Sequence, residues 1–219
     1  FGKEVFGGTG MNIWNPALLT RAFLFFSYPT EMSGSSCWIH LNEGETLVDG
    51  FTGATPLALG DSAAHYSTSV WSYIIGTIPG SVGETSVIAI LLGAFILIWT
   101  GVASWKIMTG SVLGALFVGG LANLFGVGIP FWEHLILGGF AFGTVFMATD
   151  PVTSAQTEAG KWIYGILIGA LCITVRLFNP GYAEGMMLAI LLGNTFAPVI
   201  DHCVVSVHIN RKNKKALAL

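Results

Sequence analysis

The chain has 219 residues, of which 53% are apolar and only 10% charged, and its mean hydropathy is +0.71. A soluble domain carries about 25% charged residues, so this composition excludes an ordinary soluble fold and predicts an integral membrane protein. The net charge is −3 and no basic run is interleaved with aromatic residues, which argues against nucleic-acid binding.

The first part of the chain, residues 1–84, is rich in Gly, Ser, Thr and Pro. It contains one helix-like apolar stretch, Leu18 to Tyr28, which is too short to cross a hydrocarbon core that needs about 20 residues. This stretch predicts a partial span, a helix at the membrane interface, or the end of a span that starts near Trp14. Because the chain opens at Phe1 without an initiator methionine or a signal-like segment, we expect it to be the C-terminal part of a longer protein.

After Glu84 the sequence changes to apolar runs that alternate with short polar breaks. Each run predicts a helix that crosses the membrane, and an Asp-Pro pair ends the short third run. We therefore predict an all-α membrane protein, with a helical bundle at 85–207 between partial N-terminal helices at 1–84 and a basic tail at 208–219. The five predicted spans are 85–104, 109–127, 135–149, 162–178 and 183–207.

Glycine spacing predicts close packing between these helices. Two glycines four residues apart lie on one helix face, where the backbone of a neighbouring helix can approach. Such pairs occur in successive spans and predict a tightly packed bundle: Gly110/Gly114, Gly139/Gly143 and Gly165/Gly169.

Positive charge predicts the orientation in the membrane. Counting across the five spans, Lys106, Lys161 and the basic residues of 211–215 fall on one side, whereas the alternate loops carry no Lys or Arg. By the positive-inside rule the basic side, with the C-terminus, is cytoplasmic. Residues that precede the first of these spans, among them Thr55, are then expected on the outer side.

A polar segment at 49–56, DGFTGATP, allows two interpretations of Thr55. In the structural one, Thr55 is a helix N-cap with proline at the first helical position, which both residue types favour. In the functional one, the small neighbours Gly53 and Ala54 leave the hydroxyl accessible to an external transferase that forms a phosphoester. Asp49 would then position the hydroxyl or a metal ion. The pattern alone favours the cap.

Asn12 and Asn15 form an i, i+3 pair before Pro16. Two carboxamides at this spacing can face the same way and offer donors and acceptors to a bound ligand. Alternatively, they cap and turn into a helix that begins near Pro16. The spacing does not decide between the two.

Acidic residues at membrane depth are costly and therefore suggest function. Asp201 lies inside an apolar run and is the best candidate for an ion-path carboxylate. Glu184 lies at the other end of the same run, where it is either an ion ligand or a solvated helix end. For Asp150 we favour a cap on the helix that follows. We expect Arg176 either to pair with one of these carboxylates or to extend to the outer interface.

Cysteine and histidine spacing predicts no metal site. The histidines have no partners at ligand spacing, and the cysteines show no CxxC pattern. We interpret all three cysteines as structural: Cys37, Cys172 and Cys203.

Five motifs are spread over nearly the whole chain: 6–17 (FGGTGMNIWNPA), 49–56 (DGFTGATP), 147–154 (MATDPVTS), 184–190 (EGMMLAI) and 196–202 (FAPVIDH). In combination they resemble the B subunits of sodium-translocating NADH:quinone oxidoreductases and, more distantly, the D subunits of Rnf complexes. The Met186-Met187 pair is closer to the former. The resemblance implies a fold like that of urea transporters, with inverted repeats and broken helices near the membrane midplane.

The resemblance also implies cofactors. It implies an FMN esterified through its phosphate to Thr55 on the outer side, a riboflavin near Asn12 and Asn15, and sodium uptake or passage at Glu184 and Asp201. Such a protein receives electrons from a partner flavoprotein and passes them through FMN and riboflavin towards ubiquinone, with coupled Na⁺ translocation.

The partners and location follow from the same resemblance. They are the other subunits of a respiratory complex, ubiquinone, a flavin transferase for maturation, and the lipid of a bacterial inner membrane. The enzyme would be an Na⁺-transporting NADH:ubiquinone reductase, with this chain as part of the complex. Two alternatives are an Rnf-type ferredoxin:NAD oxidoreductase component, which keeps the flavin, and a small-solute transporter or channel, which needs none.

Overall fold

The computed structural model describes residues 2–28, 57, 70–78, 83–179 and 184–216, and within these ranges every regular element is a helix. Three of these helices are long and apolar enough to cross a membrane: α6 (Trp105–Leu124), α9 (Glu158–Phe178) and α10 (Met186–Ala216). These observations confirm the predicted all-α membrane bundle.

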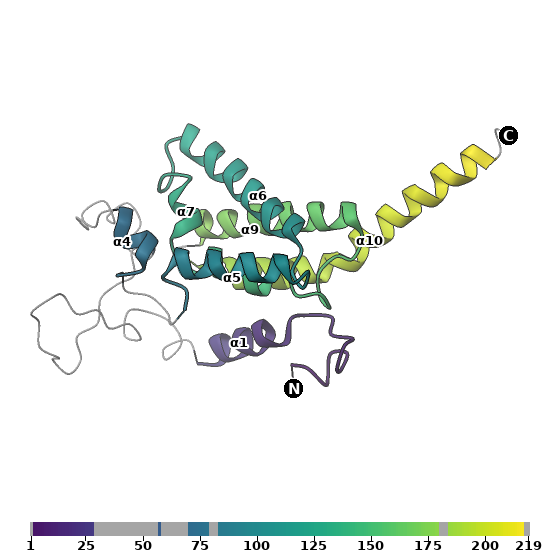
Figure 1. The fold of residues 1–219 in the computed structure, drawn as a ribbon, viewed down its shortest axis with the longest axis horizontal. Helices are drawn as coiled ribbons and strands as arrows, with labels where there is room; N and C mark the ends of the chain where they lie inside the picture. Colours follow the sequence, from purple (N-terminus) through teal and green to yellow (C-terminus); the bar gives the residue numbers. More distant parts are fainter. Residues whose placement is uncertain (1, 29–56, 58–69, 79–82, 180–183, 217–219) are drawn as a thin grey trace, which may run out of the picture.

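The backbones of α6 and α9 are in direct contact, and the two helices run in the same direction (Figure 1). The Cα of Gly165 lies 3.3 Å from the position that a Cβ on Gly110 would occupy, and main-chain atoms of α9 also crowd Gly114. Main-chain atoms of α6 crowd Gly165 and Gly169 in turn. Two of the three predicted glycine pairs therefore form a single helix–helix contact, as small residues do in membranes.

The first predicted span, 85–104, forms only the shorter helix α5 (Val87–Trp99). Its N-terminus is capped by Ser86, and the chain turns after it at Gly101, whose φ of 73° favours glycine. The outward side chains of α5 are apolar, with Leu91 and Phe95 61% and 60% exposed. A helix of this length covers only part of a bilayer core.

The third predicted span, 135–149, is not one helix. It consists of α7 (Glu133–Ile136), α8 (Phe140–Phe142) and a π-helix, η3 (Gly143–Met147). Gly138 has a φ of 64°, a left-handed conformation that separates α7 from α8. The pair Gly139/Gly143 therefore does not form a helix-packing face, and the expectation of a single short helix is wrong here, whereas broken helices are present.

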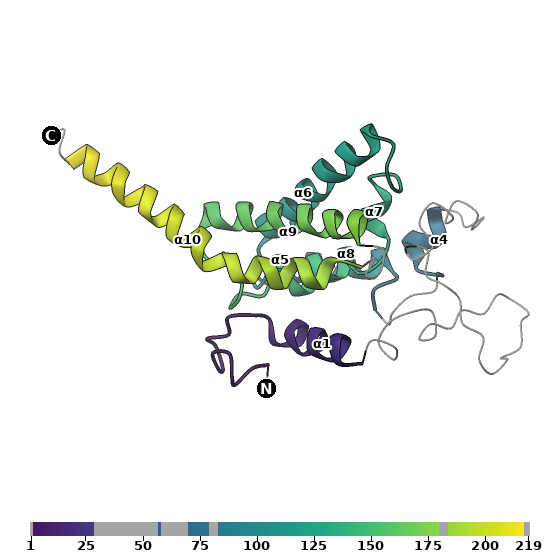
Figure 2. The same cartoon turned by 180° about the vertical axis from the view of Figure 1, so that it is seen from behind.

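The predicted partial N-terminal helix is α1 (Pro16–Ser27), which lies against α10 (Figures 1 and 2). The Trp14 ring N–H donates to the Thr195 hydroxyl at 2.9 Å. Leu18 is 1% exposed and belongs to the core shared with α9 and α10. A second short helix, α4 (Val70–Ile75), lies near the start of α5.

The helix α10 extends well beyond the rest of the bundle (Figure 2). It has 31 residues and includes Pro198, which lacks the N–H that would continue the helical ladder. The predicted basic tail continues this helix as far as Ala216, with Lys214 and Lys215 in its last turn.

The bundle has two chemically different ends. At one end, which we call the lysine end, α6 and α9 begin and Lys106 and Lys161 both bind Glu158. At the other, which we call the Glu184 end, α9 stops and α10 begins, and Arg176 contacts Glu184. The two lysines that are predicted to share one side of the membrane thus share one end of the bundle.

The glycine contact between α6 and α9 can be tested by adding one methyl group. Gly169→Ala is expected to lower the free energy of unfolding by about 1–3 kcal/mol, because its Cβ would overlap the main chain of Ser111. Gly120→Ala is the matched control, since nothing lies within 4 Å of its Cβ position. That control should be neutral or stabilise by up to about 1 kcal/mol. Thermal unfolding of the purified protein in detergent measures both, and equal midpoints for the two variants would contradict the packing argument.

Candidate functional site

The segment predicted to carry FMN lies outside the described residues; it contains Asp49, Gly53, Ala54 and Thr55. Leu57 is described and is 8% exposed, in an apolar cluster that includes Leu137. Its Cδ2 atom lies 2.7 Å from the position that a Cβ on Gly138 would occupy. The chain is therefore anchored at the Glu184 end two residues after Thr55.

Asn15 caps helix α1. Its side-chain oxygen accepts from the backbone N–H of Ala17 at 3.0 Å and of Leu18 at 3.4 Å, and its amide donates to the Met147 carbonyl at 3.5 Å. These bonds fix the carboxamide between α1 and η3. Of the two roles that the spacing allows, the side chain thus has the geometry of a cap.

Asn12 differs from Asn15 in having an unused acceptor. Its side-chain oxygen is buried and has no hydrogen-bond partner among the described residues. A buried acceptor without a donor is costly, so a ligand donor at this point would be favourable. The residues around it form a glycine-rich turn in which the Phe6 and Trp14 rings pack edge to face at 5.2 Å.

Glu184 lies at a small cavity where several elements meet. Its carboxylate accepts from the Gly139 backbone N–H at 2.7 Å. The cavity has a volume of about 30 Å³ and is lined by Arg21, Glu84, Glu184 and Met186, among others. That volume holds about one water molecule or one ion of similar size. The side chains of Glu84, Glu184 and Arg21 thus line a space large enough for one water molecule or ion.

Arg176 connects three chain segments through backbone carbonyls. Its guanidinium donates to the carbonyls of His134 at 2.6 Å, Leu137 at 3.1 Å and Glu184 at 3.2 Å. Within the part of the chain that the structure describes, no carboxylate oxygen lies within 4 Å of it. The expected pairing of Arg176 with a carboxylate is therefore absent there. Instead, the side chain ties the break between α7 and α8 to the start of α10.

Asp201 and Asp150 lie at the lysine end, and both accept local hydrogen bonds. Asp201 accepts from the backbone N–H groups of Gln156 at 2.7 Å and of Thr157 at 3.0 Å, and from the Thr157 hydroxyl. Asp150 accepts from the Thr153 hydroxyl at 2.7 Å and from a backbone N–H in the same turn. Asp201 thus fixes the connection that leads into α9. The expected helix cap at Asp150 is wrong, because residues 151–154 form a turn, which Asp150 stabilises.

A buried polar pair in the middle of the bundle is not among the residues that the sequence patterns indicate. The Tyr164 hydroxyl donates to the Asn194 side-chain oxygen at 2.6 Å, and both residues are fully buried between α9 and α10. The Asn194 amide nitrogen has no partner among the described residues. An asparagine in an apolar run is the signal that could have found this pair, because polar residues at membrane depth are rare.

No group of three or more potential metal ligands occurs within the described ranges of the chain. Cys172 is buried and Cys203 exposed, and both are free thiols. Cys37 lies outside the described residues.

Comparison with known proteins gives consistent matches along the chain. Residues 1–210 match the model of the NQR2, RnfD, RnfE family. The B subunit of the Na(+)-translocating NADH-quinone reductase of Stutzerimonas stutzeri (strain A1501) is 48% identical over 222 residues, which cover 96% of this chain and 53% of that protein. Its counterpart in Ectopseudomonas mendocina (strain ymp) is 50% identical over 96% of this chain and 53% of that protein. The B subunit of Klebsiella pneumoniae (strain 342) is 46% identical over 97% of this chain and 54% of that protein. The chain thus spans about half the length of the curated relatives it matches.

Replacing Arg176 by lysine tests whether the guanidinium holds the Glu184 end together. An ammonium cannot reach three carbonyls in fixed directions, so Arg176→Lys should lower the free energy of unfolding by about 2 kcal/mol. Arg211→Lys, at an exposed position on α10, is the control and should have no measurable effect. Chemical or thermal unfolding in detergent measures both. An Arg176→Lys protein as stable as the control would show that the carbonyl contacts are dispensable.

Proposed function

The chain belongs to the NQR2, RnfD, RnfE family, and we propose that it is the flavin-carrying part of a membrane subunit in a sodium-pumping NADH:quinone oxidoreductase. The similarity to B subunits of such reductases along nearly the whole chain carries this proposal. In this role the protein takes electrons from a partner flavoprotein, moves them through FMN and riboflavin towards ubiquinone, and couples their passage to Na⁺ translocation. Rnf-type proteins share the family, but the similar relatives named above carry the NADH-quinone reductase name.

Thr55 is proposed as the attachment point of FMN, through a phosphoester at its hydroxyl. The small neighbours Gly53 and Ala54 give a transferase access to that hydroxyl, and Asp49 assists its positioning. Leu57, two residues further along the chain, packs in the apolar cluster at the Glu184 end. The opposite end carries Lys106 and Lys161, in keeping with an FMN on the outer side.

Asn12 and Asn15 are proposed to face the riboflavin. The capping bonds of Asn15 hold the turn in place. The buried oxygen of Asn12 has no donor among the described residues, and the imide N–H or a ribityl hydroxyl of riboflavin would supply one. The flavins supply the electron-transfer chemistry, and the protein sets their position and surroundings.

Sodium movement is proposed to involve Asp201 at the lysine end and Glu184 at the other, with Asp150 as a further candidate. Asp201 and Asp150 lie near the connection into α9, and Glu184 faces the small cavity. Carboxylates at membrane depth are expensive and are retained for such tasks. The proposed setting is a bacterial inner membrane, with the C-terminus in the cytoplasm, the remaining subunits as partners and a flavin transferase required for maturation.

The flavin assignment is tested by removing one hydroxyl. Thr55→Val, produced together with the transferase, should lose in-gel flavin fluorescence after denaturation and the FMN mass on the peptide that contains residue 55. Thr52→Val is the matched control in the same segment and should keep both signals. A bare peptide in the unsubstituted, correctly matured protein would exclude the redox function and favour a transporter. FMN retained on Thr55→Val would move the attachment elsewhere.

The sodium assignment is tested at Asp201 with a variant that separates charge from structure. Asp201→Asn should lower the degree to which sodium stimulates the initial rate of quinone reduction by about tenfold or more. It should leave the flavin content unchanged. Thr157→Val removes the hydroxyl that donates to Asp201 but keeps the carboxylate. If it reproduced the whole defect, the carboxylate would act only as a structural cap. Initial rates over a range of sodium concentrations measure both variants.

A further inference from the structure

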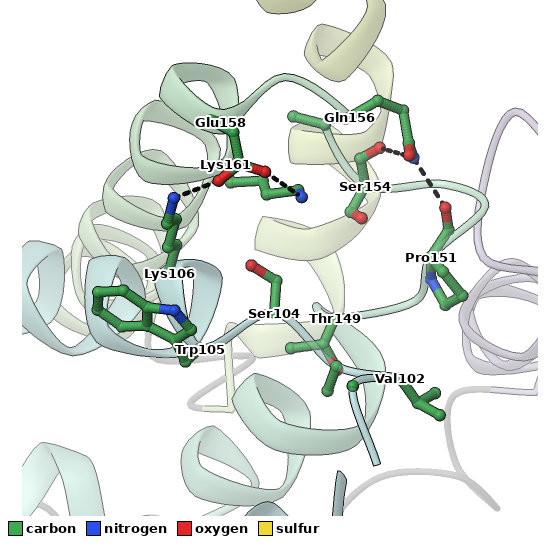
Figure 3. A pocket seen from close by; sticks show the side chains of 13 residues that line it. Val102, Ser104, Trp105, Lys106, Thr149, Pro151, Ser154, Gln156, Glu158 and Lys161 are labelled. Atoms are coloured by element: carbon green, nitrogen blue, oxygen red, sulfur yellow. Dashed lines mark hydrogen bonds and ion pairs between the residues drawn. The ribbon is translucent and has the colours of Figure 1, made fainter. Parts of the chain in front are cut away.

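A pocket of about 420 Å³ opens at the lysine end, and the proposed electron transfer uses none of its residues (Figure 3). Its walls are the connection from α5 to α6, the connection from η3 to α9, and the first turns of α6 and α9. Because α6 and α9 run in the same direction, both helix N-termini meet at this pocket. Helix N-termini carry partial positive charge and favour anions. The N-terminus of α9 is already bound by Asp201 and Thr157, which leaves that of α6 for a ligand.

The charged side chains of the pocket leave an excess of positive charge. Figure 3 shows Lys106 and Lys161 on either side of Glu158, and both ammonium groups bind its carboxylate. Among the described residues, Glu158 is the only carboxylate that lines the pocket. An ammonium has three donors, so each lysine keeps donors for a second anion. The Glu158 side chain is 67% exposed, whereas those of the lysines are 26% and 24% exposed, so the competing carboxylate is the one most open to solvent.

Two hydroxyls inside the pocket have no partner among the described residues. Ser154 is only 7% exposed, and no hydrogen bond from its hydroxyl occurs within the described part of the chain. Ser104, at the N-cap of α6, makes no side-chain capping bond. Figure 3 shows both hydroxyls turned towards the pocket interior. The Ser154 hydroxyl is accessible from the pocket, and a ligand with several acceptor oxygens can accept from it and from the two lysines.

The surroundings indicate a ligand that comes from the membrane. Trp105 and Trp162 pack edge to face with centroids 5.5 Å apart beside the pocket, and such tryptophans mark the headgroup level of a bilayer. Leu91 and Phe95 lie one turn apart on α5 and are exposed, and the exposed Val102, just after that helix, lines the pocket. An acyl chain can lie against these apolar side chains while its headgroup enters the pocket.

We propose that this pocket binds the phosphate headgroup of an anionic phospholipid, held by Lys106, Lys161 and the Ser154 hydroxyl. The phosphodiester displaces Glu158 from the lysines and accepts from the N-terminus of α6. The proposal is independent of the flavin assignment, since any bundle with these contacts would bind the same headgroup.

The test uses the complete protein, purified in its native assembly and transferred to phosphatidylcholine nanodiscs. Phosphatidylglycerol is titrated in, and binding is followed by the rise in unfolding temperature and by mass spectrometry of co-purified lipid. Lys106→Ala/Lys161→Ala should weaken phosphatidylglycerol binding by about tenfold or more, because charge-assisted bonds are lost. The control Lys212→Ala/Lys214→Ala removes the same charge from the end of α10 and should change binding much less.

Two milder variants keep the test decisive if the double lysine variant fails to fold. Ser154→Ala should weaken binding by about threefold or more, because one hydrogen-bond donor to the phosphate is lost. Glu158→Gln should strengthen it, because the competing carboxylate loses its charge. A weakened Glu158→Gln protein, or equal losses in the pocket and control double variants, would overturn the proposal. If inorganic phosphate in solution gave the same stabilisation as phosphatidylglycerol, the membrane lipid would be excluded as the source of the phosphate.

Discussion

The glycine contact between α6 and α9 is the constraint on which the rest of the structure depends. Lipid chains are as apolar as the helices, so burial alone cannot drive two such helices together, and close backbone packing has to do so. Gly110 and Gly114 allow this approach from α6, and Gly165 and Gly169 from α9. A parallel pair at this distance places both N-termini at one end, which creates the lysine end and its pocket. It also places the C-terminal end of α9, with Arg176, at the Glu184 end.

At that opposite side the governing constraint is the backbone itself. A chain that breaks inside a membrane exposes carbonyls that no water can satisfy, so the protein must supply donors. Arg176 is that donor, because its planar fork reaches carbonyls on α7, at the end of α7 and just before α10 at the same time. The break is needed for the site: it frees the Gly139 N–H to hold the Glu184 carboxylate. A continuous helix would use that N–H internally.

The sequence predicts those features that depend on local pattern. Composition and apolar runs predict the membrane bundle, and the spacing of glycines in α6 and α9 predicts their contact. The pair Gly139/Gly143 has the same spacing but lies across a helix break, because Gly138 adopts a left-handed conformation that spacing does not reveal. For Arg176 the sequence suggests a carboxylate, since opposite charges are the obvious partners. Carbonyls from distant segments are not visible in a sequence, and neither is the Tyr164–Asn194 bond.

The two ends also constrain any ion path through this chain. Helix α10 rises about 1.5 Å per residue, so Met186, next to Glu184, and Asp201 are separated by roughly 22 Å. No single ion can contact carboxylates that far apart, so Asp201 and Glu184 are two separate ion-binding positions in the proposed function. Between them, α10 offers the carboxamide of Asn194, whose oxygen is bound to Tyr164 and whose amide group can only donate. A cation requires acceptors, and this pair keeps them while its bond is intact, because the Asn194 oxygen has a second lone pair and the Tyr164 hydroxyl oxygen can also accept. Both residues are fully buried between α9 and α10, so an ion that passes along this face of α10 reaches the pair only if the two helices move apart.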